Sequence, residues 1–305
     1  MRLIQSPLNY TGGKYKLLPQ ILPHFPQDIN TFVDLFCGGA NVGCNIPCNR
    51  VVFNDINNHI IRLMQVFRDY EKHVIFDSIF SIIDRYRLSC VNQNGYAFYG
   101  CESGNGVGKY NKEKFLQLRE DFNNIRTPVD FHYYIMFYVL IVFSFNNQIR
   151  FNSKGEFNLP VGKRDFNARM QNKLSAFIDR LKSIPCIFEN TDFSNFDINE
   201  LGENDFVYCD PPYLISCATY NEQGLWNEDL ESSLYNFLDR LNARHINFAL
   251  SNILTSKGKS NHILQQWLEK NPHYICHHLN YQYSNSNYQV IDRMSGSDEV
   301  LIINY

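Results

Sequence analysis

The pattern of apolar positions predicts two strands and a helix near the start of the chain. Residues 31–36 (TFVDLF) and 50–55 (RVVFND) are short runs rich in β-branched and aromatic side chains, a composition typical of strands. Residues 57–70 instead repeat apolar side chains at helical spacing, from Ile60 to Phe67. A polar, glycine-containing segment separates the two strands.

The same alternation returns near the end of the chain. Residues 205–210 (DFVYCD), 246–252 (INFALSN) and 298–304 (DEVLIIN) have the composition of strands, and residues 230–243 have the pattern of a helix. Strands that alternate with helices favour a largely parallel sheet that is covered on both faces. We therefore predict an α/β fold.

The middle of the chain has a different character. Residues 71–185 are rich in aromatic, Asn and Lys side chains, and helices are expected at 111–125 and 131–145. We therefore predict one discontinuous α/β domain, residues 1–70 and 186–305, that is interrupted by a mainly helical insertion.

Two segments of this middle region resemble functional elements that their details exclude. Residues 101–111 (CESGNGVGKYN) lack the P-loop spacing and follow no clear strand, so a flexible loop is expected there. Residues 133–143 form the longest apolar run, which is shorter than the roughly 20 residues that cross a bilayer. The run is therefore expected to be a buried core element.

Charge modifies this picture in one region. The net charge is −3, with 28 Lys and Arg against 31 Asp and Glu, which weighs mildly against a nucleic-acid partner. A local basic patch matters more, and residues 146–173 contain six basic side chains against Glu156 and Asp165. This segment is the best candidate for phosphate contact, and a solvated basic loop is the alternative.

Cysteine usage and the first residues bear on location. The nine cysteines show no paired spacing, so we expect free thiols and no bound metal. Residues 1–14 show no apolar segment of the kind found in secretory signals. A cytoplasmic location is expected.

The segment DFVYCDPPYL combines a strand with a rigid loop. Asp210 ends the apolar run, and Pro211 and Pro212 follow at once, so the strand must stop here. A residue before proline is held in extended geometry, which applies to both Asp210 and Pro211. The loop therefore presents a carboxylate, an aromatic ring at Tyr213 and backbone carbonyls in one fixed arrangement.

A glycine-rich turn follows the first strand and predicts a cofactor site. The turn DLFCGGANVG does not have the GxGxxG spacing of nicotinamide-binding proteins, which weighs against NAD. Asp55 ends the next strand and is well placed to accept hydrogen bonds from ribose hydroxyls. Asp34, just upstream of the turn, suits a cationic cofactor better than a pyrophosphate. These features favour S-adenosylmethionine, whose sulfonium is positive and which has no phosphates.

Four motifs in order carry a family resemblance. The segments NYTGGKYKLL, DLFCGGANVG, FNDIN and DPPYL occur in that sequence along the chain. Together they resemble the adenine-N6 DNA methyltransferases of the Dam-like D12 class, the α group. The resemblance implies a Rossmann-like, S-adenosylmethionine-dependent methyltransferase sheet on residues 1–70 and 186–305. It also implies that residues 71–185 form a target-recognition domain for double-stranded DNA.

The resemblance also implies roles for individual residues. Positions that match cofactor-binding motifs are Tyr10, Lys14, Asp34, Phe36, Gly38, Gly39, Asp55, Asp192, Phe193 and Asp210. The catalytic loop matches Asp210, Pro211, Pro212 and Tyr213. The end of the insertion implies DNA contacts from Arg150, Asn152, Lys154, Lys163 and Arg164.

This interpretation explains the composition of the catalytic loop. The amino group of adenine is a poor nucleophile because its lone pair is delocalised into the ring. Asp210 and the carbonyl of Pro211 can accept its two hydrogens and favour a nitrogen whose lone pair points at the methyl group. Prolines fix that geometry in advance. Tyr213 can stack on the base, which must first be flipped out of the duplex.

Several alternatives remain open from the sequence. The expected activity is site-specific methylation of adenine N6 in a short duplex site, in a restriction-modification or epigenetic system with a possible cognate restriction endonuclease. A cytosine-N4 or RNA adenine methyltransferase is a close rival. A catalytically silent DNA-binding module of the same fold, or a nicotinamide-dependent dehydrogenase, is a rival of another class.

Overall fold

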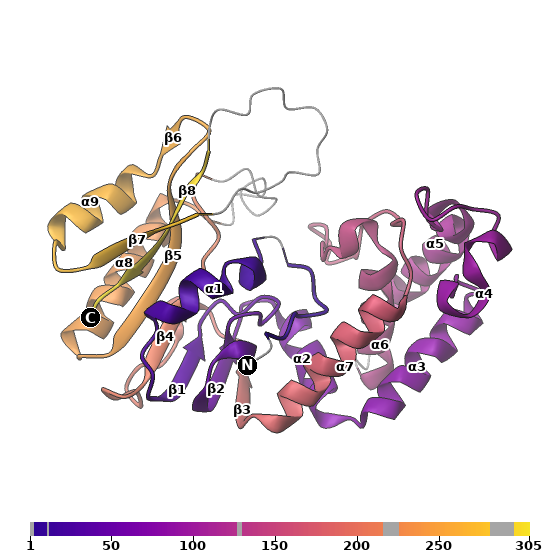
Figure 1. Cartoon of the computed structure of the whole chain (residues 1–305), viewed down its shortest axis with the longest axis horizontal. Helices are drawn as coiled ribbons and strands as arrows, with labels where there is room; N and C mark the ends of the chain where they lie inside the picture. The colour runs from indigo at the N-terminus through magenta and orange to yellow at the C-terminus, as the bar shows by residue number, and fades with distance from the viewer. Residues whose placement is uncertain (1–2, 11, 127–129, 216–225, 281–295) are drawn as a thin grey trace. The chain divides into compact units, whose positions relative to one another are not determined.

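The computed structural model describes residues 3–10, 12–126, 130–215, 226–280 and 296–305 (Figure 1). These residues form two compact units. One unit combines residues 14–56 with 185–305 and contains the sheet. The other combines residues 1–13 with 57–184 and is mainly helical. Each is described by itself below.

The sheet unit is built on mostly parallel strands. Their bounds are β1 Ile29–Asp34, β2 Cys48–Asn54, β3 Cys186–Glu189, β4 Phe206–Cys209, β5 Asn247–Ser256, β6 Lys259–Ser260, β7 Ile275–Leu279 and β8 Asp298–Ile303. The order across the sheet is β3-β2-β1-β4-β5-β8-β7, with β6 paired to β5. Strands β3, β2, β1 and β4 each pair in parallel with the next strand in this order. Strand β8 is antiparallel to both β5 and β7. The predicted α/β fold is therefore confirmed.

Side chains that alternate along the strands form two apolar layers. On one face, Val33, Val207 and Phe248 belong to a core that also includes residues of α8 (Glu228–Ala243) and α9 (His262–Lys270). On the other face, the rings of Phe32 and Phe206 lie near Phe25. Phe25 follows the short helices η1 (Lys14–Lys16), α1 (Leu18–Ile21) and η2 (Leu22–His24). Burial on both faces explains why the strands are nearly continuous apolar runs.

The strand order determines where a ligand can bind. The chain winds outward in one direction from β1 through β2 to β3, and in the other direction from β4 to β5. Carboxyl ends of parallel strands on either side of such a reversal leave a crevice at the edge of the sheet. Asp34 ends β1 and Asp210 follows β4, so both lie at that edge.

The helical unit packs around one buried helix. Its elements are α2 Asn58–Asp69, α3 Lys72–Arg85, α4 Val91–Phe98, α5 Gly108–Asn124, α6 Phe131–Phe143, η4 Phe145–Asn147 and α7 Ala168–Ser183. Every residue of α6 from Tyr133 to Phe143 is buried, and α2, α3 and α5 all contact this helix. The apolar run predicted to be a core element is therefore the centre of this unit. No helix in the described residues is long and apolar enough to cross a membrane.

The sequence predictions and the structure differ in three places. The edge strands β3 and β7 were not predicted, because both are partly exposed and lack a continuous apolar pattern. Helix α2 clusters with the helical unit and not with the sheet, so the compact units divide at residue 57 where the domain prediction divides at 71. The loop before α5, expected to be flexible, is tightly packed: a Cβ on Gly106 would lie 2.2 Å from the carbonyl oxygen of Lys163.

Candidate active site

Asp210 is held at the end of β4 by two side chains. Lys14 Nζ lies 3.0 Å from Asp210 Oδ1, and the hydroxyl of Tyr213 donates to the same oxygen at 3.0 Å. The side chain of Asp210 is 20% exposed, whereas that of Lys14 is 2% exposed. Within the described part of the chain, Asp210 Oδ2 accepts no hydrogen bond. The carboxylate is thus fixed through Oδ1, the oxygen that both side chains contact.

A second carboxylate joins this cluster. Glu299 on β8 lies 3.3 Å from Lys14 Nζ through its Oε1 and accepts from the Tyr213 hydroxyl at 3.0 Å. Lys14 Nζ also lies 4.8 Å from the centre of the Tyr213 ring. Sequence reasoning missed Glu299. Its only signal was a charged residue inside the apolar run DEVLII.

The charges in this cluster shift the pKa values of Asp210 and Lys14. Burial raises the pKa of Asp210; Lys14 opposes this shift and Glu299 adds to it. Burial alone would lower the pKa of Lys14, but Asp210 and Glu299 together outweigh it and the pKa is raised. Lys14 is therefore an ammonium at neutral pH, the form that pairs with a carboxylate.

The glycine-rich turn is tied to the end of β2. The backbone N–H of Gly38 donates to Asp55 Oδ2 at 2.8 Å, and the N–H of Cys37 donates to the carbonyl of Asn54 at 2.8 Å. Gly38 has φ 46° and Ala40 has φ 57°, so the turn passes twice through the left-handed region. Gly39 lies between these two residues. The structure thus brings together the turn and the acid that were predicted to share a cofactor.

Asp34 is buried beneath the turn. Its side chain is 2% exposed, and its Oδ2 accepts from the N–H of Gly43 at 2.9 Å. Burial raises its pKa to about 7, against the hydrogen bond from Gly43, and the charges of Asp210 and Asp55 add to the shift. A carboxyl with this pKa is partly protonated at neutral pH, and a nearby cation would favour its ionised form.

An aromatic group lies beside the turn. Phe36 and Phe193 have ring centres 5.5 Å apart, and Trp226 packs against both at 5.9 and 5.7 Å. Asp192 caps the short helix η5 (Phe193–Asn195) by accepting from the backbone N–H of Ser194. Of these two predicted cofactor-binding residues, Phe193 is therefore a buried ring beside the turn, and Asp192 is a partly exposed carboxylate.

One exposed apolar residue next to the acid was missed by sequence reasoning. Ile56 follows Asp55 directly and is 70% exposed. The side-chain amide of Asn190 donates to the carbonyls of both residues, at 2.8 and 3.0 Å, and fixes the backbone there. The signal available in the sequence was an isoleucine between polar residues in FNDIN.

The donor set at this edge of the sheet fits S-adenosylmethionine. This edge of the sheet carries the carboxylates of Asp34, Asp55 and Asp210, and the ammonium of Lys14 is already paired with Asp210 and Glu299. Carboxylates accept hydrogen bonds from ribose hydroxyls and attract a sulfonium, whereas a pyrophosphate would be repelled. Tyr10 belongs to the other unit, where its carbonyl accepts from the N–H of Gly13 at 3.1 Å.

The predicted DNA-binding residues divide into tethered and untethered side chains. Arg150 Nε donates to Asn158 Oδ1 at 2.8 Å, and Asn152 forms a turn by accepting from the N–H groups of Lys154 and Glu156. Arg164 donates to the carbonyl of Ser103 at 3.2 Å. These three shape the loop.

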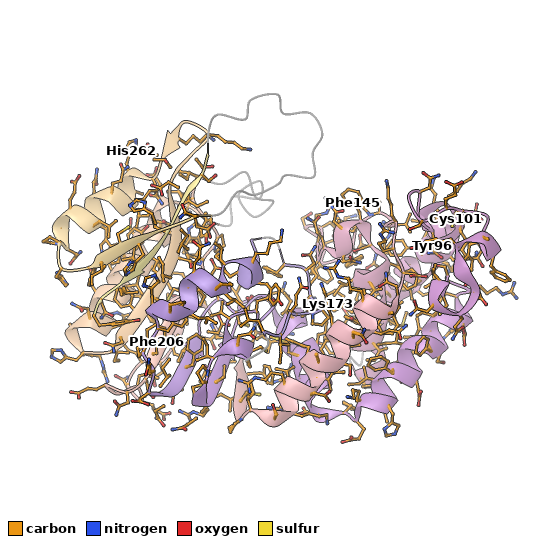
Figure 2. All side chains as sticks on the ribbon, in the orientation of Figure 1. Tyr96, Cys101, Phe145, Lys173, Phe206 and His262 are labelled. Atoms are coloured by element: carbon orange, nitrogen blue, oxygen red, sulfur yellow. The ribbon has the colours of Figure 1, made fainter. Side chains whose placement is uncertain are left out.

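Lys154 and Lys163 present free ammonium groups from the same loop. Both side chains are exposed, and neither ammonium contacts a carboxylate in the described residues. The segment also displays Phe145, which follows α6 and is 47% exposed (Figure 2). Asn146 and Asn147, which follow it, have φ 55° and 54°. A strained turn therefore presents an aromatic ring on the unit that carries the basic loop.

Comparisons with known proteins find a matching family model and several relatives. The model of a family described as D12 class N6 adenine-specific DNA methyltransferase matches residues 10–285. The chain is 40% identical over its whole length to Modification methylase StsI of Streptococcus sanguinis, and 39% identical over 99% of its length to Type II methyltransferase M.FokI of Planomicrobium okeanokoites. It covers 43% of each of these relatives. The DNA adenine methylase of Escherichia coli K12 is 26% identical over 83% of the chain and 82% of that protein.

Proposed function

The chain belongs to the D12 class of N6 adenine-specific DNA methyltransferases, and we propose that it transfers a methyl group from S-adenosylmethionine to N6 of an adenine flipped out of a short duplex site. The observation that carries the proposal is the catalytic carboxylate. Asp210 is fixed through Oδ1 by Lys14 and Tyr213, while Oδ2 accepts no hydrogen bond from the described chain. An acceptor held in this way is pre-organised for the N6–H group of a base.

The cofactor is proposed to lie along the carboxyl ends of β1, β2 and β4. Asp55 would accept from the ribose hydroxyls, and Gly38 and Gly39 would let the backbone approach the methionine part. Ile56, which is exposed, and Phe193, which is buried, are the apolar side chains proposed to contact the faces of the adenine ring. Asp34 and Asp210 would supply the negative charge opposite the sulfonium. S-adenosylmethionine brings the electrophilic methyl group to this site.

The chain's own residues do the remaining chemistry. Asp210 Oδ2 and the carbonyl of Pro211 accept the two N6 hydrogens, which turns the nitrogen lone pair toward the methyl carbon. Positive charge that develops on N6 is stabilised by Asp210. Pro211 and Pro212 hold this geometry, and the buried ring of Tyr213 is available to stack on the extruded base. Extrusion costs a few kcal/mol, which DNA contacts must offset.

The helical unit is proposed to read the DNA. Lys154 and Lys163 suit phosphates because their ammonium groups are exposed, whereas Arg150, Asn152 and Arg164 hold the loop that carries them. Phe145 is an apolar side chain displayed on the same unit, of the kind that inserts between base steps. Because one relative is named a modification methylase and another a type II methyltransferase, we extend the proposal to a cytoplasmic role beside a separately acting restriction endonuclease.

Nucleoside analysis tests the proposal. The protein is incubated with labelled S-adenosylmethionine and unmethylated duplex DNA, with RNA in a parallel reaction, and each nucleic acid is then digested to nucleosides. Labelled N6-methyladenine is expected, and Asp210→Asn serves as the inactive control. N4-methylcytosine, or label only in RNA, would replace the substrate assignment. Cofactor binding without any methylated nucleoside would favour the silent DNA-binding module.

A further inference from the structure

Glu299 is a buried carboxylate to which the mechanism above gives no role. It lies on β8, opposite Ile253 of β5 and Leu279 of β7, and is 0% exposed. A carboxylate in such a place is costly unless charged and polar partners compensate for lost hydration. Two of its partners, Lys14 and Tyr213, also hold the catalytic aspartate.

The arrangement places two acceptors on the same two donors. Lys14 Nζ lies 3.0 Å from Asp210 Oδ1 and 3.3 Å from Glu299 Oε1. The Tyr213 hydroxyl lies 3.0 Å from each of these oxygens. An ammonium has three hydrogens and can serve both acids, but a phenol has one and can serve only one acid at a time. The single hydroxyl hydrogen of Tyr213 can therefore move from Asp210 to Glu299.

We propose that Glu299 is a positioning residue that keeps Lys14 and Tyr213 in place when Asp210 takes a proton from the methylated amino group. The inference rests on the proposed methyl transfer. The N6 lone pair forms the new bond to the methyl carbon, and the carbon–sulfur electron pair leaves with sulfur. The N6 cation then loses one hydrogen as a proton to Asp210 Oδ2, which becomes neutral.

This step would leave Lys14 without a counter-ion if Asp210 were its only acid. Glu299 retains the ion pair with Lys14, and the hydroxyl hydrogen of Tyr213 can turn to Glu299. The geometry of the loop is thus preserved until Asp210 returns its proton to solvent. A neutral side chain at position 299 would keep the shape of the cluster but not this charge.

The charge of Glu299 also acts on the ground state of the catalytic acid. Its repulsion contributes to the raised pKa of Asp210, so its removal should lower that pKa. The ionisable groups that face Asp210 in the described chain are Lys14 from η1, Tyr213 from the catalytic loop, Glu299 from β8, Asp34 from β1, and Tyr208 and Cys209 from β4. Of these surrounding groups, the test variants change only Glu299.

The test compares Glu299→Gln with a neighbour on the same strand. Asp298→Asn is the matched control, because Asp298 is partly exposed and pairs with His278 outside the cluster. Single-turnover methyl transfer to duplex DNA is followed against pH, and S-adenosylmethionine binding is measured separately. We expect Glu299→Gln to transfer roughly tenfold more slowly, with the acidic limb of its pH–rate profile moved to lower pH. Asp298→Asn should match the wild type.

Two further measurements separate this role from a structural one. Glu299→Asp keeps the charge and should keep the acidic limb at the wild-type pH, with an intermediate rate, even if Glu299→Gln folds poorly. Carbon-13 NMR of the Asp210 carboxyl, assigned by comparison with Asp210→Asn, should give a lower titration midpoint in Glu299→Gln without any turnover. An equal loss of rate at every pH, or an unmoved midpoint, would overturn the inference.

The outcome for the wild type decides the proposed function independently. A wild-type protein that transfers methyl groups, with a Glu299→Gln variant that matches it, would reject only the role of Glu299. A wild-type protein that binds the cofactor and methylates no nucleic acid would reject both the proposed function and the step that depends on it.

Discussion

Lys14 Nζ contacts Asp210 Oδ1 at 3.0 Å, which joins the N-terminal glycine motif to the catalytic loop. Lys14 belongs to the 3-10 helix η1 at the start of the sheet unit, and Asp210 follows β4. The residue expected from family resemblance to serve the cofactor therefore also touches the side chain proposed to activate the substrate. A substitution at Asp210 should separate cofactor binding from activation of the substrate.

Asp210→Asn should abolish methyl transfer while cofactor binding persists. The amide keeps the size of the side chain but loses the charge that stabilises the developing cation on N6. We expect the single-turnover rate constant to fall by at least about 10²-fold, the effect of losing one pre-organised electrostatic partner. Calorimetric titration should show that S-adenosylmethionine still binds, with a weaker affinity because one of the two carboxylates proposed to lie opposite the sulfonium is lost.

Asp69→Asn provides a control, because Asp69 is half-exposed and pairs with Arg68 on the surface of α2. It should retain wild-type activity. A substantial residual rate in Asp210→Asn would show that the aspartate does not act on the amino group.

Cofactor binding should release protons from Asp34 near neutral pH. Its pKa of about 7 leaves the carboxyl partly protonated, and a sulfonium nearby favours ionisation. The affinity for S-adenosylmethionine should therefore rise with pH across this range. Calorimetry in buffers of different ionisation enthalpy measures the protons released. S-adenosylhomocysteine, which has no sulfonium, should release fewer.

The same pKa predicts how Asp34 affects stability without cofactor. A carboxyl whose pKa rises on folding destabilises the folded state once the unfolded chain ionises it. The contribution of Asp34 to the free energy of unfolding should therefore fall as the pH rises from 3.8 to about 7, and stay constant above that. Asp34→Asn should remove this slope and the proton release together. An unchanged slope would contradict the assignment.

Gly43→Ala should destabilise the sheet unit. A Cβ at Gly43 would lie 2.5 Å from Phe53 Cε1 and 3.0 Å from Asp34 Oδ2, so the buried ring would have to shift. Overpacking of this kind costs about 1–3 kcal/mol. Urea unfolding measures the loss. Gly202→Ala is the control, since a Cβ there meets no heavy atom within 4 Å, and equal losses in the two variants would refute the steric argument.

Replacing Lys154 or Lys163 by Ala should weaken DNA binding without changing cofactor affinity. Each exposed ammonium that contacts a phosphate releases about one counterion, so the slope of log affinity against log salt should shrink by about one for each substitution. Fluorescence anisotropy over a range of salt concentrations gives the slope. Lys270→Ala, on the exposed end of α9, should leave it unchanged. Equal slopes in all variants would place the DNA elsewhere.

Local sequence patterns identified most elements, because the side chains within each of these segments are enough to favour its helix or strand. The apolar runs that form β1, β2, β4, β5 and β8 are buried on both faces of the sheet. Such strands can be recognised from their own continuous apolar sequence, without knowledge of the strands they pair with. The edge strands β3 and β7 were missed because their partly exposed side chains carry no such pattern. The hydrogen bond from Gly38 to Asp55 agrees with the rule that glycine turns and acids meet at the carboxyl ends of parallel strands, although the bond itself was not predicted.

The sequence by itself determined the α/β fold, the order of the motifs and the acid that the prolines fix at the end of β4, because these depend on neighbours along the chain. Only the tertiary structure brought Lys14 and Glu299 into contact with each other beside the catalytic loop. The pairing of β8 between β5 and β7 brings together side chains from both ends of the chain. A buried charge is stable only when an oppositely charged partner is buried beside it, and the packing of the tertiary structure determines which residue that partner is.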